Sequence, residues 1–98
     1  MSYSNVEHSR VDIGASVRYT GVEEVARVAE HLKMIIEQSC EILGIGHSYH
    51  GFDSLVTDKS KVKDVTVNFS LYDVFDSELN ILHHITNQKG IGLSTKTN

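Results

Sequence analysis

The stretch from Thr20 to Gly46 has the pattern of one long amphipathic helix, and it constrains the fold more than any other part of the chain. Its apolar residues recur in steps of three and four, the spacing that places side chains on one face of an α-helix. They are Val22, Val25, Ala29, Leu32, Ile36, Cys40 and Leu43, with Val28, Ile35 and Ile42 as a second line beside them. This face is too wide for a coiled-coil seam, so we expect the helix to lie across a sheet.

Both ends of this helix carry terminal signals. Thr20 followed by Glu23 matches a capping box, in which each side chain bonds the other residue's backbone N–H. At the far end, Gly44 is expected to adopt the left-handed conformation, with Ile45 folding back onto Cys40 as in a Schellman motif.

Alternation of apolar and polar residues predicts strands at 11–19 and 65–72. Residues 54–57 look extended and precede a polar turn at 58–61, so a hairpin with the second of these strands is the natural reading. A second helix is expected from Asp73 or Asp76 to about Lys89, buried through Phe75, Leu79, Leu82 and Ile85 and ended by Gly90. Residues 91–93 leave room for a short last strand.

The resulting order is the βαββα(β) order of ferredoxin-like folds. The fold class predicted is therefore α+β: a two-layer sandwich in which two helices cover one face of an antiparallel sheet. One domain at 11–93 is expected, with a flexible N-terminal arm at 1–10 and a polar tail at 94–98.

The sheet face away from the helices would carry the even-numbered strand residues. It would be polar, and three roles stay open for it: contact with water, half of a dimer interface, or a ligand platform. Arg18 and Tyr72 are its candidate ligand-binding residues.

The segment 44–54, expected to be a loop, combines glycines, aromatic residues and histidines. Such loops often contact ligands or partners. Its candidate ligand-binding residues are His47, Tyr49, His50 and Asp53. The alternative is a structural connection whose Phe52 fills the core.

The outer face of the long helix carries an acidic ridge. Its members are Glu23, Glu30, Glu37 and Glu41. The ridge is either a solvated helix face or a docking surface for a basic protein partner.

Composition narrows the function classes. The formal net charge of −4 disfavours nucleic acid and anionic membranes as partners. The single cysteine, Cys40, rules out an internal disulfide and fits a reducing, cytoplasmic setting. The six histidines match no established zinc spacing, and no catalytic or phosphate-binding motif is present. We therefore expect no metal, no cofactor and no catalytic residue.

The function predicted is that of a small non-catalytic binding module. It would be a cytosolic regulator or inhibitor acting by protein–protein interaction or ligand sequestration. It would self-associate through the open sheet face or a strand edge, because a small sheet leaves edges that need cover. The alternative is a small-molecule-binding protein or small enzyme that uses the histidine-containing segment 44–54.

Overall fold

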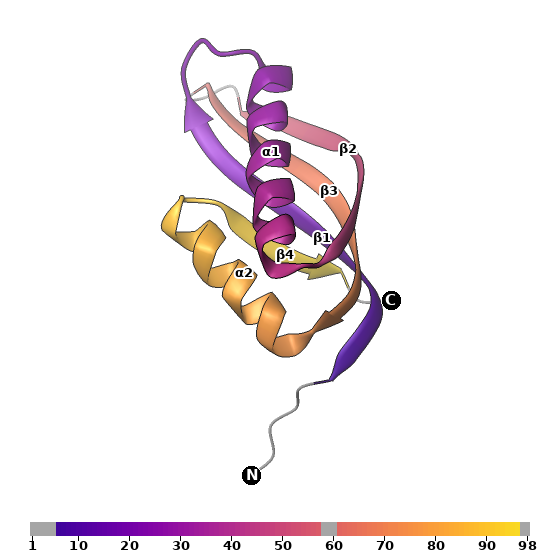
Figure 1. Cartoon of the computed structure of the whole chain (residues 1–98). Coiled ribbons are helices and arrows are strands. Elements are labelled where there is room, and N and C mark those ends of the chain that lie inside the picture. Colours follow the sequence, from indigo (N-terminus) through magenta and orange to yellow (C-terminus); the bar gives the residue numbers. More distant parts are fainter. Residues whose placement is uncertain (1–5, 58–60, 97–98) are drawn as a thin grey trace.

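The computed structural model of the chain describes residues 6–57 and 61–96. Within these residues the chain forms a four-stranded antiparallel sheet and two helices, which is an α+β architecture (Figure 1). The elements in chain order are β1 (Glu7–Thr20), α1 (Val25–Leu43), β2 (Gly46–Thr57), β3 (Val62–Phe75), α2 (Asp76–Gln88) and β4 (Gly92–Lys96). The strands lie in the order β2-β3-β1-β4, so β2 and β4 are the edge strands.

The core lies between the sheet and the helices, which are both on the same face of the sheet (Figure 1). Strand alternation sends the odd-numbered residues of β1 and β3 toward the helices, where Ala15, Val67 and Phe69 are fully buried. From α1, Leu32 and Ile36 pack into this core, and Leu82 enters it from α2. The predicted inner faces of both long strands are thereby confirmed. We call the uncovered side of the sheet the open face.

The expected start of the long helix is wrong. Thr20 belongs to β1 and pairs with Val62, so its backbone is used by the sheet and not by a helix cap. The helix begins at Val25; Glu24 holds the N-cap position without a side-chain cap bond, and Val22 is 99% exposed. The capping box fails because the sheet ladder extends further than the local pattern indicated.

The expected end of this helix is confirmed. Gly44 has a φ of 72°, and its N–H donates to the Glu41 carbonyl at 3.2 Å. The Ile45 N–H donates to the Cys40 carbonyl at 2.9 Å, which completes a Schellman motif. Ile45 is buried.

The second helix also ends as expected but is entered differently. Gly90 has a φ of 76°, and the Ile91 N–H donates to the Thr86 carbonyl at 2.9 Å. At the other end neither Asp73 nor Asp76 caps the helix: Phe75 holds the N-cap position, and its N–H donates to Oε1 of Glu78 at 2.9 Å.

The segment 44–54 is not a loop, contrary to expectation. Almost all of it belongs to β2, which pairs with β3 along its whole length. A β-bulge at His50 explains why no period was visible, because Tyr49 pairs with Phe69 while Gly51 pairs with the next residue, Asn68. The extra residue reverses which parity faces the helices. Before His50 the odd-numbered residues of β2 face the helices, and after it the even-numbered residues do.

The terminal segments are more ordered than expected where they are described. β1 begins at Glu7, so residues 7–10 belong to a strand and not to an arm; Glu7 pairs with Phe75. β4 likewise includes residues 94–96 of the expected tail. Residues 1–5 and 97–98 lie outside the described residues, as do residues 58–60 of the expected turn.

Candidate functional site

Four polar side chains form a connected cluster on the open face, which we call the open-face cluster: Arg10, Asp12, His50 and Ser70. The ladder sets Asp12 of β1 opposite Ser70 of β3, and the bulge in β2 brings His50 to the same place. The Ser70 hydroxyl donates to Oδ1 of Asp12 at 2.7 Å, and Nε2 of His50 lies 2.6 Å from the Ser70 Oγ. Nε of Arg10 donates to the same Asp12 oxygen at 3.1 Å.

The cluster stabilises the charged form of Asp12. The hydrogen bonds from Ser70 and Arg10, together with the nearby charges of Arg10 and His50, hold the pKa of Asp12 below its ordinary value of 3.8. Asp12 is therefore an anion at neutral pH and can only accept hydrogen bonds. Since the single Ser70 proton goes to Asp12, the bond between His50 and Ser70 requires Nε2 of His50 to donate.

This direction of hydrogen bonding opposes nucleophilic catalysis. A serine nucleophile needs a base that takes its proton, usually a histidine nitrogen acting as acceptor. Here the serine lies between the other two residues and donates to the carboxylate, and its side chain is fully buried. The cluster contains the three residue types of a serine triad, but the chain of donors runs from His50 through Ser70 to Asp12.

A shallow hollow of about 200 Å³ adjoins the cluster. It is lined by Arg10, Asp12, Ile13, His50, Asn68 and Phe69. Beside it, Nδ2 of Asn68 donates to Oδ2 of Asp53 at 3.0 Å. The structure thus brings two of the predicted ligand-binding residues, His50 and Asp53, to one part of the open face, and adds Arg10, Asp12 and Ser70, whose proximity depends on strand register.

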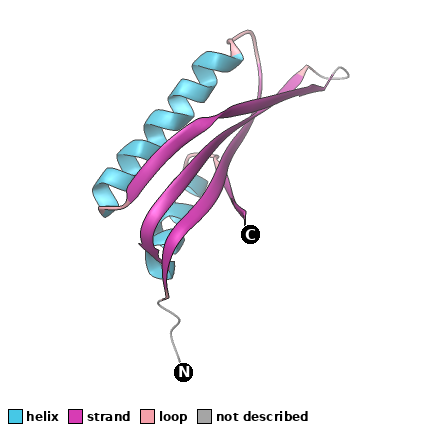
Figure 2. Ribbon diagram, turned by 90° about the vertical axis from the view of Figure 1, so that its right-hand side faces the viewer, coloured by secondary structure: helices cyan, strands magenta, loops and turns pink. Residues whose placement is uncertain are grey.

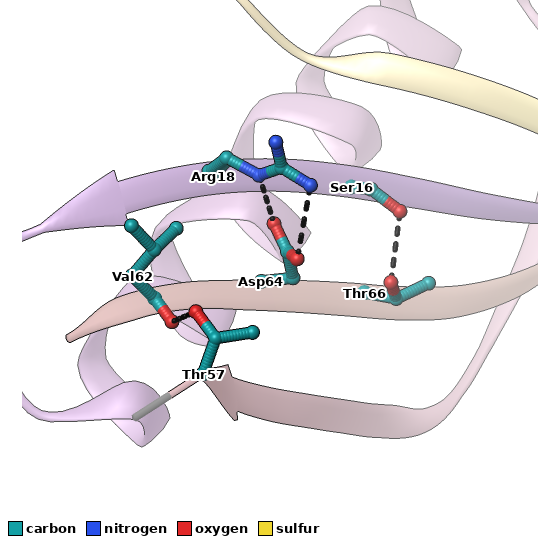
Figure 3. A network of polar contacts seen from close by, with 6 residues as sticks. All are labelled: Ser16, Arg18, Thr57, Val62, Asp64 and Thr66. Atoms are coloured by element: carbon teal, nitrogen blue, oxygen red, sulfur yellow. Dashed lines mark hydrogen bonds and ion pairs between the residues drawn. The ribbon is translucent and has the colours of Figure 1, made fainter. Parts of the chain in front are cut away.

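Arg18 lies elsewhere on the open face, toward the end of the β2–β3 hairpin. Its guanidinium donates to Asp64 through Nε at 2.8 Å and through Nη2 at 3.3 Å, as Figure 3 shows. Beside this pair, the hydroxyls of Ser16 and Thr66 lie 2.8 Å apart (Figure 3). Arg18 therefore belongs to a row of cross-strand pairs between β1 and β3. None of these hydrogen bonds joins it to the open-face cluster.

Two of the remaining predicted ligand residues, Tyr49 and His47, are separated from the open-face cluster by the sheet. Tyr49 is on the helix side, where its ring meets Phe69 edge-on at 5.8 Å and Nζ of Lys33 lies 4.7 Å from its centroid. His47 is also on that side, with Nδ1 3.5 Å from the Ile45 carbonyl. Tyr72 is on the open face, where it is the cross-strand partner of Arg10 of the open-face cluster, and it also pairs with Gly46. It lies at the other end of the sheet from Arg18.

The acidic ridge is shorter than expected. Glu23 precedes α1, and its carbonyl accepts from the Tyr19 hydroxyl at 3.2 Å. Glu30, Glu37 and Glu41 remain on the helix; Glu30 and Glu41 are exposed, and Glu37 is half-buried. Within residues 6–57 and 61–96, no three or more His, Cys, Asp or Glu side chains come together in a way that could hold a metal ion.

The far half of β2 exposes apolar side chains along a strand edge that pairs with no other strand among the described residues. We call residues 51–57 the outer β2 segment. Phe52 is 42% exposed, Leu55 62% and Val56 50%, so Phe52 does not fill the core. Sheets usually protect edges with short strands, prolines or lysines. The other edge strand, β4, has five residues, whereas β2 has twelve and contains no lysine, arginine or proline.

This segment also extends away from the helix layer. In Figure 2 the hairpin end of β2 and β3 curves away from α1. Sequence reasoning missed this surface because the bulge concealed the strand. Phe52, Leu55 and Val56, three apolar residues within five positions, were the available signal.

We compared the sequence with known proteins and found no match. The sequence matches no protein-family model, and no match was found among curated proteins. Neither described helix combines the length and apolar character that a membrane span requires.

Proposed function

We propose that this chain is a non-catalytic binding module, a regulator or inhibitor that acts by protein–protein interaction. The contact is made by an extended strand of the partner, which adds to the sheet along the outer β2 segment. The observation that carries this proposal is the long free edge of β2 with Phe52, Leu55 and Val56 exposed beside it.

Strand addition fits the chemistry of this edge. An edge strand presents backbone N–H and C=O groups that a second extended chain can bond, which supplies affinity. Register with β3 places Phe52 and Val56 on the helix side and Leu55 on the open face. A partner strand with apolar residues in alternation would bury these side chains and displace water from them.

We also propose a more specific fold class. We assign the chain to the ferredoxin-like two-layer sandwiches, on the support of its βαββαβ element order and the strand order β2-β3-β1-β4. We also propose a cytoplasmic setting, for which the buried free thiol of Cys40 is the support. Nucleic acid and membranes are not proposed as partners, since the net charge is −4.

The hollow beside His50 favours a second candidate function, the binding of a small polar molecule. Arg10, Asp12 and His50 place polar side chains around a hollow of about 200 Å³. His50→Ala would abolish binding of this kind and leave strand addition intact, whereas changes at Phe52 and Val56 would do the reverse. Titration calorimetry with a panel of metabolites would detect it.

Strand addition is tested without a known partner by peptide display. A random peptide library displayed on phage is selected on the immobilised chain and on the variant Phe52→Lys/Val56→Lys. Ser94→Lys, which places a lysine at an exposed position of β4, is the matched control. We expect peptides with alternating apolar residues that bind the unaltered chain and the control but not the double variant. These peptides should protect the amides of residues 51–57 from hydrogen exchange. Peptides that bind all three proteins equally would overturn the proposal, as would the absence of enriched peptides on a chain that sedimentation shows to be monomeric.

A further inference from the structure

We infer that the strand received by the outer β2 segment is the same segment of a second copy. The two segments pair antiparallel about a two-fold axis at Ser54, and the product is a homodimer with one continuous sheet. This inference rests on the proposed function, because it names the partner of the same edge. The two sheets of order β2-β3-β1-β4 would join through β2 into eight strands.

Symmetry restricts the register. If the axis stands perpendicular to the sheet, each residue faces one that points to the same side of the sheet. A residue of the outer β2 segment then pairs only with a residue of the same parity, because successive side chains alternate between faces. The two-fold axis must therefore pass beside a single residue. Near the middle of the outer β2 segment, that residue is Asp53, Ser54 or Leu55.

Among these registers, the one centred on Ser54 suits the side chains. It places Phe52 of each copy opposite Val56 of the other, on the side of the sheet where both residues point. Aromatic and β-branched residues form favourable cross-strand pairs, and this register makes two of them. Apolar surface that is now exposed at both residues would be buried twice over.

The other two registers lose these pairs. An axis at Asp53 sets the two Asp53 carboxylates directly opposite each other, and like charges in this position are destabilising. An axis at Leu55 sets Val56 opposite Ser54 and carries Phe52 past Thr57, the last residue of the strand. In the Ser54 register, Asp53 faces Leu55 and keeps its hydrogen bond from Asn68 at 3.0 Å.

The surroundings of this edge permit the approach of a second copy. The hairpin end of β2 and β3 curves away from α1 in Figure 2, so the helix layer does not stand beside the segment. Residues 52–57 are all exposed. The bulge at His50 separates them from the part of β2 that packs beneath α1 through Tyr49.

Charge substitutions test both the site and the register. Molar mass is measured by sedimentation equilibrium over a concentration series, and circular dichroism confirms that each variant is folded. We expect the unaltered chain and Ser94→Lys to dimerise. Phe52→Lys/Val56→Lys places lysines opposite each other twice and should raise the dissociation constant up to about thirty-fold. Phe52→Glu/Val56→Lys places opposite charges in both pairs and should restore the dimer.

A cross-link provides a second measurement that does not depend on the charge variants. Paired residues of antiparallel strands have Cα separations of about 4.5–5.5 Å, which lie within the range that a disulfide spans. Ser54→Cys should therefore form a covalent dimer under mild oxidation, while Ser94→Cys should not. Cys40 is buried and does not compete.

The outcomes separate the inference from the function on which it rests. An unaltered chain that is monomeric at every concentration, with no cross-link at position 54, overturns self-pairing. If displayed peptides still bind the edge, the proposed function stands and the partner is a foreign strand. A dimer that survives Phe52→Lys/Val56→Lys overturns the site, and a dimer lost equally in Phe52→Glu/Val56→Lys overturns the register.

Discussion

His50 donates from Nε2 to the Ser70 hydroxyl across 2.6 Å, and the two residues meet because β2 carries one extra residue at that point. Ser70 in turn donates to Asp12 at 2.7 Å. A side chain of β2 is thereby coupled to one of β1 through the strand between them. The coupling has consequences for stability that can be measured.

Loss of the Ser70 hydroxyl should destabilise the fold. Ser70→Ala leaves His50 without its acceptor and Asp12 without one donor, in a position that is fully buried. We expect the free energy of unfolding to fall by about 1–3 kcal/mol, the cost of leaving such partners unsatisfied. Urea unfolding at a fixed protein concentration measures it. Ser94→Ala removes a hydroxyl at an exposed position of β4 and should change the value by less than about 0.5 kcal/mol. Equal effects for the two variants would contradict the role of the cluster.

Acid should weaken the fold partly through Asp12. Its pKa is lower in the folded chain than the ordinary value of 3.8, because Ser70 and Arg10 bond the carboxylate, so the unfolded chain binds more protons on acidification. The contribution of Asp12 is complete above the ordinary pKa and is lost as the pH falls through the lower folded value. Asp12→Asn should flatten the dependence of unfolding free energy on pH in this acidic range. The pKa of Asp64 is lowered by Arg18, so Asp64→Asn should flatten it as well. An unchanged pH dependence in Asp12→Asn would show that the cluster does not hold the charge.

Two glycines close together differ in what they tolerate. Gly44 has a φ of 72°, where a Cβ costs about 1–2 kcal/mol, so Gly44→Ala should lower the free energy of unfolding by that amount. At Gly46 a Cβ would meet Tyr72 at 3.6 Å, an ordinary contact, and Gly46→Ala should be nearly neutral. Thermal or urea unfolding compares them. A loss from Gly44→Ala that is no larger than the loss from Gly46→Ala would contradict the need for glycine at the end of α1.

Cys40 should be unreactive in the folded chain. Burial, with a smaller effect of the nearby Glu37 charge, raises the pKa of its thiol from 9.0 to about 11, so little thiolate exists at pH 8. We expect a maleimide to modify Cys40 in urea but not under native conditions, as read by intact mass. Rapid native labelling would show that this part of α1 opens readily.

The features readable from the sequence are those that depend on near neighbours. The helical period from Val25 to Leu43 and the stops at Gly44 and Gly90 arise within a few residues of backbone, so they were predicted correctly. The alternation in β1 and β3 was equally plain, since one side of each strand is buried throughout.

The errors came where the sheet overrode a local signal. Thr20 has a capping pattern with Glu23, but its backbone bonds β3, so the cap never forms. At His50 a single extra residue interrupts the alternation of β2, so the sequence pattern there was interpreted as a loop. In the open-face cluster, Ser70 and Asp12 are 58 residues apart in the sequence. Helix and strand periods act over a few residues and cannot predict such a contact.

Local periodicity and turn chemistry were thus enough to specify the type and order of most elements, because helix period, strand alternation and left-handed glycines are properties of short segments. The register of β2 against β3, the meeting of His50, Ser70 and Asp12, and the free apolar edge at Phe52 and Val56 were decided by tertiary pairing. Those relationships depend on which backbone groups find each other across the sheet. The single extra residue at His50 shifts that pairing, although the residues on either side of it keep the alternation of a strand.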